Sequence, residues 1–141
     1  MRRFAAVLAL LLVAGAAPAQ RFRPVEVFVD SSGAPLAAWQ LEVIADGEAQ
    51  IVGVEGGASP AFAEAPAYDP EALAGGRIIL AAFSLRDAAE LPRGRTRVAT
   101  VHVREPGAAP RYSVRLQAAA GPDGTPIPAT ASLDLDQGDA R

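Results

Sequence analysis

Residues 111–119 read Arg-Tyr-Ser-Val-Arg-Leu-Gln-Ala-Ala, and apolar and polar side chains alternate along them. Successive side chains of a β-strand point to opposite faces, so this stretch predicts a strand with one face on a core and the other in water. The inward set is Tyr112, Val114, Leu116 and Ala118, and the outward set is Arg111, Ser113, Arg115 and Gln117.

The same alternation recurs on both sides of this stretch. Further strands are expected at 25–29, 37–45, 50–55, 95–104 and 127–135, with Val25, Val27 and Val29 on one face of the first and Trp39, Leu41 and Val43 on one face of the second. Asp46-Gly47 closes the second strand with a hairpin-type turn signal. Pro126 and Pro128 place the last strand at an edge or a bulge.

Residues 77–84 read Arg-Ile-Ile-Leu-Ala-Ala-Phe-Ser, an apolar run without alternation. Such a run is typical of a strand buried on both faces, and a central position is therefore expected for it.

The residues between Gly56 and Gly76 are rich in Gly, Pro and Ala and predict a long irregular connection. Within it, Asp69-Pro70-Glu71 has a helix-capping residue followed by a proline, which predicts a short helical turn. A second helical turn is expected at 85–91, and Phe62 and Tyr68 are expected to pin the connection to the sheets.

Many short strands, little helix and no internal repeat predict an all-β fold, an antiparallel β-sandwich of jelly-roll type with seven to nine strands and one or two helical turns. The chain of 141 residues is long enough for one domain, expected at 20–136, with a frayed tail at 137–141.

The first nineteen residues predict a secretory signal peptide. A basic start at Arg2-Arg3 precedes an apolar run from Phe4 to Ala14, and Ala17-Pro18-Ala19 fits the small-residue cleavage pattern before Gln20. An uncleaved membrane anchor is the alternative, although the run is shorter than the roughly 20 residues that span a bilayer. A secreted or periplasmic protein is expected, without membrane contact after cleavage.

The amino-acid composition excludes several classes of reaction and ligand. The chain contains no Cys, which excludes disulfides, thiolate nucleophiles and cysteine-ligated metal sites. Loss of Arg2 and Arg3 with the leader takes the formal net charge from −3 to −5, and an acidic domain is a poor candidate for nucleic acid.

Catalytic and metal-binding signatures are weak. His102 is the one histidine, and a hydrolase would have to pair it with Ser84 or Ser113, yet no Gly-x-Ser-x-Gly motif is present. A solvated strand histidine is the simpler interpretation. Glu42, Glu55, Glu64 and Asp69 are candidates for a glycosidase carboxylate pair, but linear spacing alone cannot place two of them across a sugar.

The stretch Asp134-Leu-Asp136-Gln-Gly138-Asp139 begins like a calcium loop but lacks the later ligands. A sugar-binding platform would need exposed aromatic rings, and Trp39 and Tyr112 fall in register with inward aliphatic residues. No catalytic residue, cofactor or metal ligand is therefore predicted.

Three stretches together resemble the cohesin-like branch of secreted β-sandwich modules, in the superfamily that also holds carbohydrate-binding modules. They are residues 25–29 with 37–43, residues 51–56, and residues 76–84 before 98–103. The resemblance implies a non-catalytic bacterial module that binds a protein partner of the dockerin type through one sheet face. The chain departs from the scaffoldin pattern because it is a solitary module without a Pro/Thr-rich linker.

The expected partner surface is the outward set of the best-patterned strand, namely Arg111, Arg115 and Gln117, because exposed arginines are frequent interface anchors. An ordinary solvated face is the alternative for these three residues. Carbohydrate binding by the same sandwich is the alternative function, and an exported hydrolase built around His102 is a third.

Overall fold

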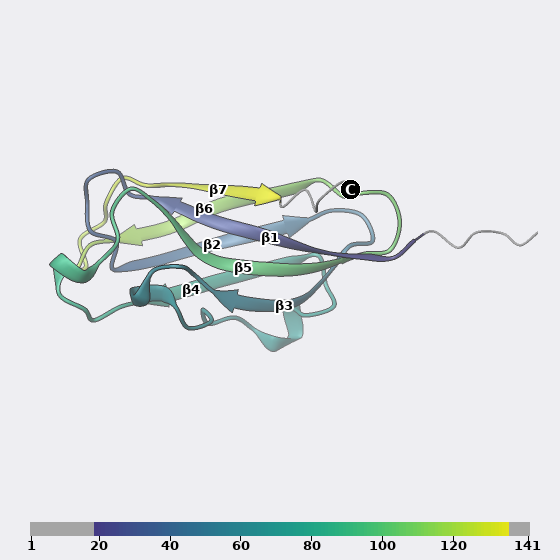
Figure 1. Cartoon of the computed structure of the whole chain (residues 1–141), viewed down its shortest axis with the longest axis horizontal. Helices are drawn as coiled ribbons and strands as arrows, with labels where there is room; N and C mark the ends of the chain where they lie inside the picture. The colour runs from purple at the N-terminus through teal and green to yellow at the C-terminus, as the bar shows by residue number, and fades with distance from the viewer. Residues whose placement is uncertain (1–18, 136–141) are drawn as a thin grey trace, which may run out of the picture.

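The computed structural model describes residues 19–135, in which two antiparallel sheets pack against each other (Figure 1). The four-stranded sheet has the order β3-β5-β1-β7, with β3 at Gln50–Gly56, β5 at Arg95–Glu105, β1 at Arg21–Asp30 and β7 at Thr130–Leu135. The three-stranded sheet has the order β4-β2-β6, with β4 at Arg77–Phe83, β2 at Ala38–Ala45 and β6 at Tyr112–Ala120. The predicted all-β sandwich of seven to nine strands is confirmed. The leader up to residue 18 and the tail from residue 136 lie outside the described residues.

The chain changes sheet at every connection between these strands. The odd-numbered strands form the four-stranded sheet and the even-numbered strands form the three-stranded sheet. The hairpin expected at Asp46-Gly47 is therefore wrong, because this turn joins β2 to β3 across the sandwich. Gly47 does adopt a φ of 67°, as its turn chemistry requires. The first and last strands are neighbours, and Val25 pairs with Leu135 where β7 ends.

The core lies between the two sheets and is built from the inward positions that the alternation predicted. Val25, Val27 and Val29 of β1 are fully buried. From β2, Trp39, Leu41 and Val43 face them, which confirms the assignment of both strands. The prediction that Phe62 and Tyr68 attach the 56–76 connection to the sheets is also confirmed, because Phe62 is buried and Tyr68 packs against the core.

The expectation for residues 77–84 is wrong in its placement. β4 forms an edge of its sheet and pairs with β2 on one side only, apart from an isolated bridge between Ala67 and Ala81. Ile78 and Leu80 face the core, whereas Ile79 is 41% exposed and Phe83 is 74% exposed. An apolar run fits a two-sided strand and an edge strand with an uncovered face equally well.

β6 departs from strict alternation at one point. Its register against β2 shifts between Gln40 and Leu41, so that Gln40 lies opposite Ala118 while Leu41 lies opposite Leu116. The irregularity turns Ala118 to the outside and Ala119 to the core, which corrects the predicted inward position of Ala118. Tyr112, Val114 and Leu116 pack against the core as predicted.

Three short 3₁₀ turns punctuate the connections. The turn at Pro70–Ala72 is capped by Asp69, whose Oδ1 accepts a hydrogen bond of 3.0 Å from the backbone N–H of Glu71, as its sequence predicted. The turn at Ala88–Glu90 lies inside the predicted range 85–91. A third turn, at Pro60–Phe62, was not predicted. No helix in residues 19–135 is long and apolar enough to cross a membrane.

Candidate functional site

The outer face of the three-stranded sheet carries the predicted surface residues of β6. Pairing across the sheet sets Ala38 between Phe83 and Ala120, Gln40 between Ala81 and Ala118, and Glu42 between Ile79 and Arg115. Small and apolar side chains therefore occupy one half of this face, and charged side chains begin at the row of Glu42. We call these residues, together with the exposed Gln117 of β6 and Arg77 of β4, the outer face throughout.

Gln117 and Arg115 both belong to the outer face, but their side chains have different neighbours. Gln117 Oε1 accepts a hydrogen bond of 2.8 Å from Gln40 Nε2 of the central strand. Arg115 is exposed beside Glu42. The structure thus brings two of the three predicted partner-binding residues onto one surface.

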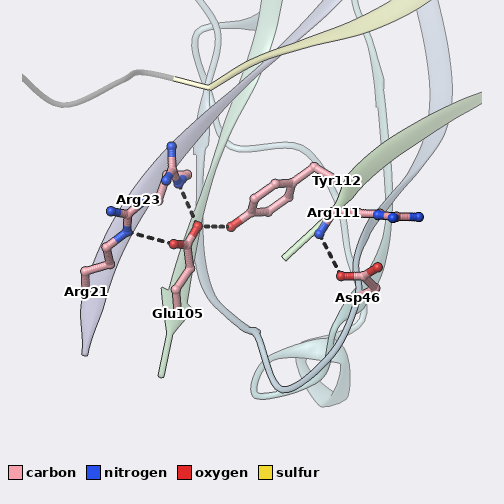
Figure 2. A network of polar contacts seen from close by, with 6 residues as sticks. All are labelled: Arg21, Arg23, Asp46, Glu105, Arg111 and Tyr112. Carbon is pink, nitrogen blue, oxygen red and sulfur yellow. Dashed lines mark hydrogen bonds and ion pairs between the residues drawn. The ribbon is translucent and has the colours of Figure 1, made fainter. Parts of the chain in front are cut away.

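Arg111 lies just before β6, at the end of the sandwich (Figure 2). Its backbone N–H donates to Asp46 Oδ1 at 2.7 Å, and its carbonyl oxygen accepts from the Asp46 N–H at 3.0 Å. These backbone bonds clamp the β2–β3 connection, and the exposed side chain stands away from the centre of the outer face.

Glu42 is outward-facing but only 3% exposed. Arg77 of β4 neutralises it, with Nε donating to Oε2 at 2.6 Å. Because Arg77 is itself largely exposed and Arg115 lies on the other side of Glu42, the charged half of the outer face presents guanidinium groups to solvent.

A pocket of about 750 Å³ opens at the apolar half of this sheet. Ala38, Ala81 and Ala118 form part of its lining, and the 60–67 segment supplies another part. Gln40 and Glu64 are the polar side chains at the pocket. The small alanine side chains leave this space open, and the sequence interpretation missed it because an alanine in a strand predicts neither a pocket nor a ligand.

Trp39 also lines the pocket. Its ring packs edge-on against Phe62, with ring centroids 6.1 Å apart and planes at 75°. Its Nε1 is the one buried side-chain nitrogen or oxygen within residues 19–135 that has no hydrogen-bond partner. A buried donor without a partner costs free energy, so an acceptor that reached this N–H would be stabilising.

The second polar assembly surrounds Glu105, which is completely buried (Figure 2). Its Oε1 accepts from Arg23 Nε and from the Tyr112 hydroxyl, each at 2.6 Å, and its Oε2 accepts from Arg21 Nε at 2.8 Å. These donors come from β1 and β6, so the carboxylate ties the two sheets together at one end. Burial, with the neighbouring Glu105 carboxylate, raises the pKa of Tyr112 well above its usual range.

The sequence analysis did not predict the Glu105 cluster, although the alternation of β5 contains a signal for it. Ala99, Val101 and Val103 are buried at alternate positions of β5, and Glu105 is the next residue on that face. A carboxylate in an inward register requires cationic partners, and Arg21 and Arg23 stand at alternate positions of β1. The side chains of Arg21, Arg23 and Glu105 are bonded to one another, and we therefore interpret the cluster as structural.

The structure separates the groups that a hydrolase would need. His102 lies on the outside of the four-stranded sheet, where its Nε2 is 2.9 Å from Glu55 Oε2. Ser113 is exposed on β6 of the other sheet, and Ser84 directly follows β4. His102 is a partly exposed strand residue, as expected.

The four candidate carboxylates are dispersed. Glu42 pairs with Arg77, Glu55 with His102, Asp69 caps a 3₁₀ turn and Glu64 lines the pocket. Within residues 19–135, no group of three or more His, Cys, Asp or Glu side chains could hold a metal ion.

The tail motif is described only at its beginning. Asp134 pairs with Arg95 at 2.9 Å, and the residues from Asp136 onward lie outside the described part.

The aromatic rings considered for sugar binding do not form an exposed platform. Trp39 is 2% exposed, the Tyr112 hydroxyl is bound to Glu105, and Tyr68 packs against the core. Within residues 19–135 the exposed phenylalanine rings are those of Phe22 and Phe83, which belong to different sheets.

Comparison of the chain with protein-family models, with curated proteins and with solved structures gave no match. The cohesin-like resemblance therefore remains an interpretation of the hydrophobic pattern.

Proposed function

We propose that this protein is an exported, non-catalytic interaction module that binds a protein partner through the outer face of its three-stranded sheet. The observation that carries the proposal is the uncovered apolar half of that face. Ile79, Phe83 and Leu85 are three of the five large apolar side chains that the described residues leave exposed. Phe83 lies in this half, Ile79 lies in the row of Glu42, and Leu85 comes two residues after the end of β4.

The composition of the face supports this proposal. Protein interfaces combine an apolar centre with a polar rim, and arginine is enriched in them. Here the alanines and Phe83 form the apolar part, and Arg77 and Arg115 form the charged side. A contiguous exposed apolar patch beside polar residues is a common mark of a docking surface.

The opposite surface of the sandwich is less suited to the same role. On the four-stranded sheet, His102 is bonded to Glu55 and Arg104 to Gln50. Polar side chains that already satisfy one another would have to exchange these bonds for bonds to a partner, which adds little net affinity.

More specifically, we propose that the partner is of the dockerin type, as the sequence resemblance implies. The carbohydrate-binding alternative is weaker, because it depended on Trp39 or Tyr112 standing exposed beside Tyr68, and the Trp39 ring lies in the core.

The test is an affinity capture with a matched pair of variants. The chain is immobilised and exposed to the exported proteins of its source organism, and a calcium-loaded dockerin module is offered separately, each with and without a calcium chelator. Captured proteins are read by mass spectrometry. Ile79→Asp places a charge on the outer face, and Val52→Asp places one on the four-stranded sheet at nearly the same exposure, 42% against 41%.

We expect a specific prey to be retained by the wild type and by Val52→Asp and to be lost with Ile79→Asp. Loss of the prey on chelation would identify the dockerin-type contact. Equal retention by both variants would exclude the outer face, and binding to an insoluble glycan with no protein retained would favour the carbohydrate-binding alternative.

A further inference from the structure

The first strand of the sandwich begins two residues after the predicted leader cleavage site at Ala19. β1 starts at Arg21, and the side chains of Arg21 and Arg23 are held by the buried Glu105. Cleavage after Ala19 would leave one residue, Gln20, in front of this anchored strand. Gln20 is exposed, so both its new α-amine and its side-chain amide would be accessible.

The side chain of Gln20 has a cationic partner in the fold. Arg104 of β5 donates from Nη1 to Gln20 Oε1 at 3.2 Å. The same guanidinium is fixed by Gln50 of β3, whose Oε1 accepts from Arg104 Nε at 2.9 Å. The amide carbonyl of Gln20 is thereby polarised by a positive charge that the neighbouring strand holds in place.

We propose that Gln20, once the leader is removed, cyclises to pyroglutamate and that Arg104 assists the reaction. The lone pair of the α-amine attacks Cδ of the side chain, and a bond between that nitrogen and Cδ forms. The bond between Cδ and Nε2 then breaks, and Nε2 leaves as ammonia after receiving one proton from the α-amine. The step consumes no oxidant, reductant or other co-reactant.

Arg104 contributes where charge develops. Attack on Cδ places negative charge on Oε1, the atom to which Arg104 donates, and donors aimed at a developing oxyanion lower the barrier. Oε1 then becomes the lactam carbonyl oxygen, so the same hydrogen bond is available to the reactant, the intermediate and the product.

The proposal rests on the predicted cleavage after Ala19, and the first experiment tests both together. The full chain with its leader is produced in an exporting bacterial host, and the exported protein is digested after glutamate to release the peptide 20–26. We expect this peptide at a mass lower by one ammonia than its sequence requires, with no free α-amine. A free amine on Gln20 overturns the cyclisation, and a different first residue overturns the whole proposal.

The second experiment isolates Arg104. The full chain is pulse-labelled during export, and the cyclised fraction of the peptide 20–26 is followed with time for the wild type, Arg104→Leu, Arg104→Lys and the control Arg115→Leu on the opposite sheet. Loss of one net hydrogen bond corresponds to about a two- to tenfold slower reaction for Arg104→Leu. Arg104→Lys, which keeps the positive charge, should be intermediate. Equal rates in all four proteins would overturn the role of Arg104.

Discussion

Glu105 places a carboxylate where solvent does not reach, and three donors from two sheets surround it. Arg23 is nearly buried as well, while Arg21 is half exposed. A buried ion pair contributes little net stability when it is intact, but removing one partner leaves an uncompensated charge in the interior. The cluster therefore makes the fold sensitive to single substitutions at this end.

We predict that Glu105→Gln lowers the free energy of unfolding by about 3 kcal/mol, because Arg23 would keep its charge without an anionic partner. Tyr112→Phe removes one hydrogen bond only and should cost about 1 kcal/mol. Urea denaturation of both variants measures the difference. Equal losses would mean that the charge of Glu105 has no special role.

The Tyr112 hydroxyl also predicts how stability depends on pH. Burial and the Glu105 carboxylate raise the pKa of Tyr112 above its ordinary value of 10.0, so the folded protein prefers the neutral phenol. This contribution is fully present below pH 10.0, and it falls as the pH rises above that value, because the unfolded chain then loses the proton more readily. Urea midpoints measured up to strongly alkaline pH should fall less in Tyr112→Phe than in the wild type, and Tyr68→Phe serves as the control.

At the scale of elements, the alternation predicted which residues face the core but not which strands are neighbours. Val25, Val27 and Val29 were assigned correctly because burial on one face shows directly in a period of two. The run at 77–84 and the turn at Asp46-Gly47 were misplaced because a segment's own residues do not state which sheet it joins. The pocket and the Glu105 cluster arise from residues distant in the chain, and for that reason local patterns missed them.

The edge position of β4 predicts contrasting effects at adjacent residues. Ile79→Lys should change the free energy of unfolding by less than about 0.5 kcal/mol, because Ile79 points outward from an edge strand. Leu80→Ala should cost about 3 kcal/mol, because Leu80 is fully buried in the core. Chemical denaturation measures both, and a large loss from Ile79→Lys would restore the two-sided burial expected from the sequence.

Glycines in and after β3 divide into permissive and restrictive positions. A Cβ at Gly57 would overlap the backbone of Arg97 and Val98, so Gly57→Ala should cost about 3 kcal/mol or more. A Cβ at Gly53 would meet nothing within 4 Å, and Gly53→Ala should stay within about 0.5 kcal/mol of the wild type. Thermal melts of the two variants provide the comparison, and similar melting temperatures would show that the connection after β3 can move away from β5.

For the whole molecule, the alternation of the chain between sheets has a kinetic consequence. No two consecutive strands pair, so every strand pair must bring together segments separated by at least one strand of the other sheet. Folds dominated by such non-local pairs fold slowly. We predict folding on a scale of about milliseconds to seconds. Stopped-flow fluorescence of Trp39, the only tryptophan, measures it, and folding within microseconds would contradict the topology.

The pairing of β1 with β7 determines how the domain would respond to mechanical load. Val25 near the start of β1 pairs with Leu135 at the end of β7, so the two ends of the domain lie at the same end of this strand pair. A force that pulls these ends apart would therefore break the hydrogen bonds of the pair one after another. Such geometry resists tension weakly, because the hydrogen bonds bear the load in succession. Neither terminal strand belongs to the three-stranded sheet, and tension therefore enters the sandwich through the layer opposite the proposed docking face.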